Sequence, residues 1–275
     1  MPRPCIGGSG EPQQYGARPV IAALLIGREG SVGFPGKNTQ PVLGRPLMLY
    51  PMLAAIHSRH VARCYLSTDS ARYKEIGREH NWEIIDRPPH LATKEALGED
   101  AFRHGYETIR DTCLRRGELL DQIVLLFCNA PTVTSALIDQ GVELLAARPD
   151  LDSAVSVSTY NMWSPIRARR ETPDGLLEPF VPHEALGLGV VINCDRDSQG
   201  DVCYADMGVS VVRPRCFENM EEGLLPQKWM GQRIAPLKQW GGCDVDYDWQ
   251  LPQAEFWLRR HGFDETSTPY DGSRP

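Results

Sequence analysis

Features that would indicate a membrane-bound or secreted protein are missing from this chain of 275 residues. No run reaches the ~18 consecutive apolar residues that a membrane-spanning helix needs. Residues 1–17 are rich in Gly, Pro and Gln and hold no apolar stretch of signal-peptide length. No pair among the eight cysteines is spaced as CxxC, so the sequence indicates neither a metal ribbon nor a redox pair. We therefore expect a cytoplasmic protein with reduced thiols that does not bind membranes.

An excess of positive charge is also missing. The chain has 29 Lys and Arg residues against 36 Asp and Glu residues, a formal net charge of −7. This balance argues against binding to nucleic acid or to an anionic membrane through bulk charge, but it allows a local basic pocket for a small anion. His57 and His60 are three residues apart on an expected helix, but no third ligand lies nearby. We expect them to be surface histidines rather than metal ligands.

Short apolar runs alternate with longer amphipathic segments from residue 20 to residue 158. The runs VIAALLI at 20–26 and QIVLLFC at 122–128 are typical of strands that are buried on both faces of a parallel sheet. Strands are expected at 20–26, 62–67, 83–86, 122–128 and 153–158, and helices at 46–58, 70–80, 96–116 and 135–147. This alternation predicts an α/β fold with a doubly wound, mostly parallel sheet.

The pattern changes after about residue 159. Residues 160–206 are rich in Pro, Gly and Arg with one apolar run at 188–192, and we expect them to form a small inserted antiparallel lobe. Further strands are expected at 208–212 and 234–237, followed by a closing helix at 249–261. The predicted organisation is a flexible N-terminal tail at 1–17, one domain at 18–262 that contains the lobe, and a C-terminal tail at 263–275.

The loop after the first strand, GREGSVGFPGKN at 27–38, has a glycine at every third position. Such a loop lets backbone N–H groups form an anion-binding concavity, and Arg28 and Lys37 add two cations. Its place beyond the carboxyl end of a strand is where open α/β sheets bind ligands. The spacing excludes both the P-loop and the GxGxxG dinucleotide motif. A flexible surface loop is the alternative.

The segment Cys243–Trp249 carries alternating acidic residues. Asp244 and Asp246 are two positions apart in an extended stretch, so both side chains are expected on one face. Paired carboxylates suit a hard cation such as Mg²⁺, which can bridge to nucleotide phosphates. The alternative is an acidic helix N-terminus that complements the helix dipole, a role open to Asp248.

Polar residues also follow the other expected strands. Residues 67–69, Ser-Thr-Asp, end the second strand and could contact a ligand or cap a helix. Arg87 follows the third strand and Asn129 the fourth, where their side chains would face the same crevice. For Arg87, a solvated position is the alternative.

Together these residues resemble the cytidylyltransferases that make CMP-activated acidic compounds, of which the CMP-sialic acid synthetases are the best known. The family's ARGGSKGxPxKN motif matches residues 28–38, PLxGxPL matches 41–47, STD matches 67–69, and RPxxLAT matches 87–93. Gly208–Val211 is similar to the family's NGAIYI strand, and 244–246 to its IDID segment. The resemblance runs from about residue 20 to residue 262 and implies a Rossmann-like nucleotidyltransferase fold.

The resemblance implies roles for the candidate residues. The glycine loop would hold the phosphates of CTP, Asn38 and Arg87 would recognise the cytosine or its ribose, and the paired aspartates would bind Mg²⁺. The lobe would mediate a homodimer and form part of the acceptor site. The predicted CTP-binding residues are Gly27, Arg28, Gly30, Ser31, Gly33, Lys37, Asn38, Arg87 and Asn129. The predicted catalytic residues are Arg28, Lys37 and Asp246, the metal ligands Asp244 and Asp246, and the acceptor-binding residues Arg167, Arg196 and Asn129. For the two lobe arginines, a solvated surface position is the alternative.

Three departures from the family pattern concern the phosphate loop and the acceptor side. Val32 replaces a loop lysine, residues 127–133 lack the glutamine and arginine of QPTSPLR, and Lys94 replaces the acid of LATD. CTP recognition is thus expected to be kept, with an altered acceptor site. The loop and the CDVDYDWQ…EFWLRRHG ending are similar to a subgroup that activates phosphonates, including the phosphonoformate type, in the biosynthesis of phosphonate and phosphinate natural products.

The expected reaction is attack of a small anionic acceptor on the α-phosphorus of CTP with release of pyrophosphate. A phosphonate acceptor is already anionic near neutral pH, whereas a sugar hydroxyl needs a general base. We therefore expect an antibiotic-pathway phosphonate cytidylyltransferase, with a CMP-sialic or nonulosonic acid synthetase as the alternative. A catalytically inactive nucleotide-binding module is the third hypothesis.

Overall fold

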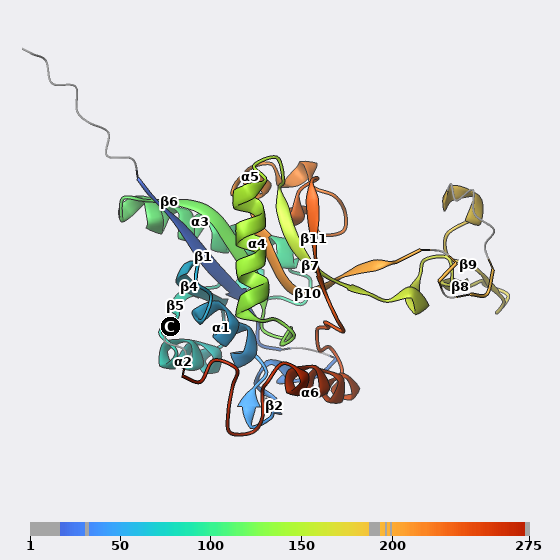
Figure 1. Cartoon of the computed structure of the whole chain (residues 1–275), viewed down its shortest axis with the longest axis horizontal. Coiled ribbons are helices and arrows are strands. Elements are labelled where there is room, and N and C mark those ends of the chain that lie inside the picture. The colour runs from blue at the N-terminus through green and yellow to red at the C-terminus, as the bar shows by residue number, and fades with distance from the viewer. Residues whose placement is uncertain (1–16, 31–32, 187–192, 196, 199, 273–275) are drawn as a thin grey trace, which may run out of the picture.

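A sheet of seven strands forms the centre of the chain, whose structure is a computed structural model describing residues 17–30, 33–186, 193–195, 197–198 and 200–272. The strands are β1 (Arg18–Ile26), β4 (Val61–Thr68), β5 (Glu83–Asp86), β6 (Glu118–Phe127), β7 (Ser153–Thr159), β10 (Cys203–Val212) and β11 (Ile234–Gln239). They lie in the order β11-β7-β10-β6-β1-β4-β5 (Figure 1). β10 is antiparallel to both of its neighbours, and the other neighbouring pairs are parallel. The predicted mostly parallel sheet is confirmed.

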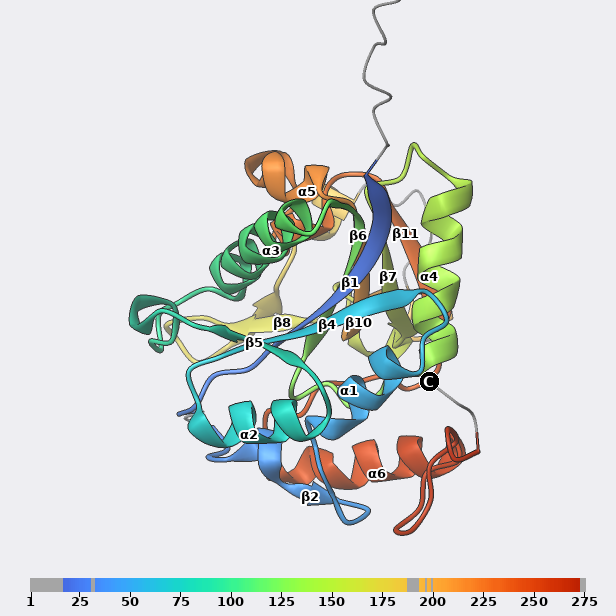
Figure 2. The same ribbon diagram turned by 90° about the vertical axis from the view of Figure 1, so that its left-hand side faces the viewer.

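Helices cover both faces of this sheet. They are α1 (Leu49–Ile56), α2 (Ala71–Glu79), α3 (Gly98–Arg115), α4 (Ser135–Ala147) and α5 (Arg215–Glu218), whereas α6 (Leu251–Arg260) packs against α1 and β2 and not on the sheet. Alternate residues of β1 enter opposite cores: Ala23 and Leu25 pack with α1, α2 and α4, whereas Ala22 and Leu24 pack with α3 and α5. Figure 2 shows the sheet between these two sets of helices. The continuous apolar run therefore predicted a doubly wound arrangement correctly, because a strand buried on both faces needs apolar residues at every position.

Some element boundaries differ from the sequence-based expectation. The first helix begins at Leu49 rather than at residue 46, because Arg45 and Pro46 form strand β3 and pair with β2 (Pro41–Val42). Ser70 precedes α2 but its side chain makes no capping hydrogen bond. The short helix α5 was not predicted, since its four residues are too few to show a helical period.

The segment expected as an inserted lobe contains a two-stranded antiparallel sheet, β8 (Arg169–Glu171) paired with β9 (Leu177–Pro179). This hairpin stands away from the central sheet (Figure 1). The apolar run expected at 188–192 lies outside the described residues, as do residues 1–16 of the expected N-terminal tail. The structure does not test whether this segment mediates dimerisation.

The residues after α6 were expected to form a C-terminal tail, and up to residue 272 they pack onto the domain. Phe263 is 2% exposed and Tyr270 8% exposed, in a third apolar cluster with Tyr50 of α1 and Trp257 of α6. The burial of these two side chains was not predicted because the residues around them are mostly polar. Among the helices of the described residues, none is long and apolar enough to cross a membrane.

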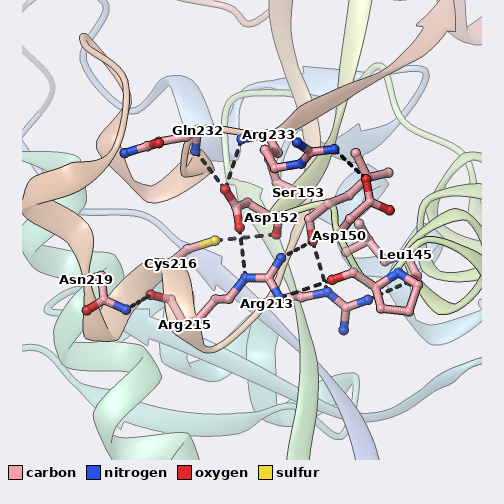
Figure 3. A network of polar contacts seen from close by, with 12 residues as sticks. Leu145, Asp150, Asp152, Ser153, Arg213, Arg215, Cys216, Asn219, Gln232 and Arg233 are labelled. Atoms are coloured by element: carbon pink, nitrogen blue, oxygen red, sulfur yellow. Dashed lines mark hydrogen bonds and ion pairs between the residues drawn. The ribbon is translucent and has the colours of Figure 1, made fainter.

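At the amino end of β7, away from the strand ends described below, Asp152 holds three chain segments together (Figure 3). Its carboxylate accepts hydrogen bonds from the backbone N–H groups of Gln232 and Arg233, each at 2.9 Å, and from Nε of Arg215 at 2.8 Å. Burial by itself would raise the pKa of Asp152, but these hydrogen bonds outweigh it and lower the pKa below its usual 3.8. The ionised carboxylate is therefore a stabilising group.

Replacing Asp152 with Asn should lower the free energy of unfolding by about 2 kcal/mol at pH 7, because an amide group would face backbone donors. Since the folded-state pKa is lowered, the contribution of Asp152 is complete above pH 3.8 and is lost as the pH falls through the folded-state pKa. Urea unfolding should thus show that the difference in free energy of unfolding between the wild type and Asp152→Asn is larger at pH 7 than at acidic pH. Asp150→Asn is the matched control: its exposed carboxylate pairs only with Arg148 and Arg233, so the loss should be far smaller. An equal loss in both variants would contradict the assignment.

Candidate active site

The carboxyl ends of β1, β5 and β6 open into a pocket of about 190 Å³. The sequence marked this edge of the sheet because each of these strands is followed by a polar or cationic residue. The predicted CTP-binding residues that line the pocket are Gly27, Arg28, Lys37, Asn38, Arg87 and Asn129. Residues from three separate stretches of the chain, 27–38, 87 and 129, thus meet at one site, as predicted for a doubly wound sheet.

Arg87 is the most deeply buried cation of this pocket, at 8% exposure. Its Nη2 donates to the backbone oxygen of Ser67 at 2.7 Å and its Nε to the hydroxyl of the same residue at 3.4 Å. Burial lowers the pKa of Arg87, and within the described residues it forms no ion pair with a carboxylate. A buried cation without an anionic partner is costly and is typical of a site that receives an anion. The solvated position considered from the sequence is therefore wrong.

Asn38 also lines this pocket. It belongs to the short 3₁₀ helix η1 (Lys37–Thr39), which begins after Gly36 in the left-handed conformation. Its side chain is 5% exposed, and its Oδ1 has no hydrogen-bond partner in the described part of the chain. An orphaned buried acceptor needs a donor, and the exocyclic amino group of cytosine is one. Asn38 therefore lines the pocket with an unsatisfied acceptor, and its recognition of a base stays a prediction from the resemblance.

Gly27 brings the loop backbone against the end of β6. A Cβ atom at this position would lie 2.4 Å from Sγ of Cys128, so no larger residue fits without displacing β6. The backbone N–H of Glu29 donates to Oδ1 of Asp69 at 3.0 Å, which ties the loop to the end of β4. Gly30 and Gly33 are described but do not line the pocket, and Ser31 lies outside the described residues.

The paired aspartates lie beside the pocket. Nδ2 of Asn129 is 3.4 Å from Oδ2 of Asp244 and 3.4 Å from Oδ1 of Asp246, so both carboxylates share one face, as the alternation predicted. Val245, between them, points into the third apolar cluster. Burial and the nearby Asp246 charge raise the pKa of Asp244. Lys37 forms an ion pair with Asp246 at 2.5 Å and so joins the carboxylates to the phosphate loop.

This donor set fits a magnesium ion. The two carboxylates are hard oxygen donors, and Mg²⁺ commonly uses one or two carboxylates together with substrate phosphates and water. Within the described residues there is no cluster of three or more His, Cys, Asp or Glu side chains that would form a complete protein cage for a metal. The geometry therefore suits a metal that arrives with a phosphate ligand.

The predicted acceptor residues are not brought together. Asn129 lies in the pocket, but Arg167 donates to the backbone oxygen of Cys194 at 3.1 Å and lines neither this pocket nor its neighbour, and Arg196 lies outside the described residues. A second pocket of about 180 Å³ borders Asp244 instead. It is lined by aromatic and amide side chains that sequence reasoning did not assign to a site: Tyr160, Trp163, Tyr204, Trp249, Gln250 and Gln253.

A family model described as "Cytidylyltransferase" matches the region that contains most of the first pocket. Residues 22–111 match this family. The cytidylyltransferase match includes Arg28, Lys37, Asn38 and Arg87, and it ends before Asn129 and the paired aspartates. It supports the family resemblance seen in the motifs; the phosphonate subgroup stays a prediction.

Curated relatives with this activity in their names are similar over part of the chain. An N-acylneuraminate cytidylyltransferase of Escherichia coli is 28% identical over 149 residues, which are 54% of this chain and 34% of the relative. The corresponding protein of Oncorhynchus mykiss is 24% identical over 88% of this chain and 51% of the relative. The chain thus spans a third to a half of the length of these relatives. They are nucleotidyltransferases, the enzyme class that the sequence predicted.

Solved cytidylyltransferase structures share the fold. A CMP:2-keto-3-deoxy-manno-octonic acid synthetase complexed with CTP matches with a TM-score of 0.60 at 15% identity, over 88% of this chain and 99% of that one. A 4-diphosphocytidyl-2C-methyl-D-erythritol synthase from Anaerococcus prevotii matches with a TM-score of 0.57 at 10% identity, covering 88% and 96%. At such identities the likeness shows the fold, and it confirms the predicted fold class.

Proposed function

We propose that this chain is a CTP-dependent cytidylyltransferase that joins CMP to an acidic acceptor and releases pyrophosphate. The observation that carries the proposal is the buried, unpaired Arg87 in a pocket that also holds Arg28 and Lys37. Three cations around one small pocket suit a polyanionic ligand, and the match of residues 22–111 to the cytidylyltransferases makes CTP the favoured one.

The pocket offers separate places for the parts of CTP. Its apolar wall, which includes Leu97 and Phe127, suits the nucleoside, and Asn38 presents an unsatisfied acceptor for the amino group of cytosine. Arg28 and Lys37 lie on the loop that would face the phosphates. Because phosphoryl transfer depends mainly on positioning and charge neutralisation, these cations would offset the charge that develops on pyrophosphate.

Asp244 and Asp246 would hold Mg²⁺, which neutralises phosphate charge and orients the α-phosphate when it is bound. Lys37 forms an ion pair with Asp246. Lys37 is thus held beside the carboxylates that would bind the metal, where its ammonium group could also pair with a phosphate oxygen of CTP.

A 2-keto sugar acid is the first candidate for the acceptor. The names of the similar proteins include N-acylneuraminate and 3-deoxy-manno-octulosonate cytidylyltransferases. The second pocket continues from Asp244 and presents Gln250 and Gln253 to the hydroxyl groups of such an acid. Its aromatic walls suit the apolar face of a sugar ring.

A small phosphonate is the second candidate, and one observation favours it. No His or Glu is present among the described residues that line either pocket. Apart from the metal-site Asp244, the carboxylate found there is Asp206, which already accepts four hydrogen bonds, so a hydroxyl nucleophile has no obvious base. A phosphonate oxygen is already ionised and needs none. The replaced residues 127–133 after β6 agree with a changed acceptor.

Pyrophosphate release should be measured with CTP and Mg²⁺ against a panel of 2-keto sugar acids and phosphonates. Turnover is expected with one of these classes, and the class identifies the acceptor. Replacing CTP with UTP should abolish turnover, because the Asn38 acceptor has no amino group to bind. If CTP binds but no acceptor supports turnover, the inactive nucleotide-binding module is the better interpretation. If CTP does not bind, the proposal is wrong.

The homodimer and the cytoplasmic location remain predictions. Three apolar side chains of the β8–β9 hairpin region are exposed, Leu176 at 67%, Leu177 at 72% and Phe180 at 58%. Apolar side chains on a projecting hairpin suit contact with a second copy. Light scattering of the purified chain decides the oligomeric state.

A further inference from the structure

A buried carboxylate lies against the segment that carries the paired aspartates. Asp206, on β10, is 5% exposed, and a Cβ atom added to Gly242 would lie 2.4 Å from its Oδ2. In the described residues Asp206 has no Lys, Arg or His as a hydrogen-bond donor. A buried charge that lacks a cationic partner calls for an explanation in terms of the donors it holds.

Four neutral donors surround this carboxylate. Oδ1 accepts from the hydroxyl of Ser156 at 2.5 Å and from the backbone N–H of Gly208 at 3.2 Å. Oδ2 accepts from the hydroxyl of Ser158 at 2.7 Å and from Nε2 of Gln239 at 2.9 Å. Every lone-pair direction is thus used, and each of the two oxygens holds a different part of the structure.

The partners of Oδ2 are connected by hydrogen bonds to the segment that carries Asp244 and Asp246. Ser158, whose hydroxyl hydrogen points to Asp206, accepts the backbone N–H of Gly242 at 2.9 Å. Gln239 also donates to the backbone oxygen of Thr132 at 3.1 Å. The Thr132 hydroxyl in turn accepts from the N–H of Cys243 at 2.8 Å and donates to its carbonyl at 2.9 Å. The two residues before Asp244 are Gly242 and Cys243. Hydrogen bonds therefore connect both of them, through Ser158 and through Thr132 and Gln239, to Oδ2 of Asp206.

In the described part of the chain, the partners of Oδ1 form no hydrogen bond with the segment that carries Asp244 and Asp246. Ser156 accepts the backbone N–H of Val209 at 2.9 Å, a contact within the central sheet between β7 and β10. The two serines lie two positions apart on β7, are both fully buried, and donate to the same carboxylate. They differ in which oxygen of Asp206 each one bonds and in which backbone N–H each one accepts, which makes them a matched pair for an experiment.

We propose that Asp206 is a positioning residue that sets the place of Asp244 and Asp246 for the metal. It orients the Ser158 hydroxyl so that its lone pair faces Gly242, and it orients the Gln239 amide that supports Thr132. A carboxylate is needed because it presents only acceptors to four donors; an asparagine would turn one N–H group toward two of them. The proposal rests on the function proposed above.

The test compares Asp206→Asn and Ser158→Ala with Ser156→Ala as the control. Mn²⁺ binding in the presence of CTP, followed by electron paramagnetic resonance, should weaken by about tenfold in the first two variants and by less than about twofold in the control, as for outer-shell partners of metal ligands. The Mg²⁺ concentration for half-maximal turnover should rise in parallel. CTP affinity without metal should be unchanged in all three variants, because Arg87 and Asn38 are not part of this network.

Each outcome separates the positioning role from other roles. If Ser156→Ala weakens Mn²⁺ binding as much as Ser158→Ala, the effect is general destabilisation and the proposal is overturned. If Asp206→Asn raises only the KM of the acceptor, Asp206 acts in the second pocket and not on the metal site. If the wild-type chain binds Mn²⁺ with CTP but supports no turnover, the proposed function fails while the metal comparison still decides the role of Asp206.

Discussion

Arg87→Met should weaken CTP binding by about 100-fold, equivalent to roughly 3 kcal/mol, because it removes the one buried cation that lacks a carboxylate partner in the described residues. In the absence of nucleotide the same variant should be as stable as the wild type or more stable. Burial penalises the charged guanidinium, and the shorter, uncharged methionine packs its apolar side chain there without that cost. Isothermal titration with CTP and thermal unfolding of the free protein measure the two effects.

The opposite signs of these two effects make the prediction specific. Arg87→Lys keeps a charge but loses the planar fork of donors, so CTP binding should be intermediate. Arg72→Met serves as the control, since this exposed residue of α2 pairs only with Glu75 three positions away. A loss of stability in Arg87→Met with unchanged CTP affinity would mean that Arg87 is structural and that the pocket does not hold a nucleotide.

Asp246→Asn should lower turnover by roughly 1,000-fold, on the order of 4 kcal/mol of transition-state stabilisation, because a metal ligand loses its charge. The same change releases Lys37 from its ion pair. CTP binding measured in EDTA should therefore become tighter by a few-fold, since the freed lysine can pair with a phosphate. Steady-state kinetics at varied Mg²⁺ and titration with CTP in EDTA check the two results.

Asp248→Asn is the control for Asp246→Asn. It continues the same alternation two residues later, and its carboxylate only accepts the backbone N–H of Trp249 at 2.8 Å. Turnover should change by less than about twofold, as for an exposed residue outside the site. Equal losses in the two variants would favour the helix N-terminus interpretation of this acidic segment over a metal site.

Sequence reasoning located the first pocket well because its residues follow a simple rule. In a doubly wound sheet the residues just after parallel strands meet at one edge, so Arg28, Arg87 and Asn129 could be assigned to one site from their places in the chain. The two-residue period of an extended segment likewise placed Asp244 and Asp246 on one face. These inferences need only local periodicity and the direction of the strands.

The acceptor side could not be obtained in this way. Arg167 is an arginine in a polar loop, and its bond to the Cys194 carbonyl depends on how the chain folds back. The second pocket combines Tyr160 and Trp163, after β7, with Trp249 and Gln253, near α6. No periodic pattern relates these segments, so the contact between them cannot be predicted from a single sequence.

Asp206 shows the same difference between local pattern and folded structure. The expected strand began at residue 208, so Asp206 was assigned to the end of the inserted lobe, whereas it lies on β10. A lone acid also gives no sign that four donors from β7, β10 and β11 converge on it. The apolar periodicity and the glycine and charge placement determined the sheet, the order of its elements and the anion-binding loop, because those depend on neighbours along the chain. Tertiary structure alone decided that Arg87 has no carboxylate partner among the described residues, that Lys37 meets Asp246, and that four donors converge on Asp206. Burial and pairing depend on residues far away in the sequence, whose approach is set by packing of the whole domain.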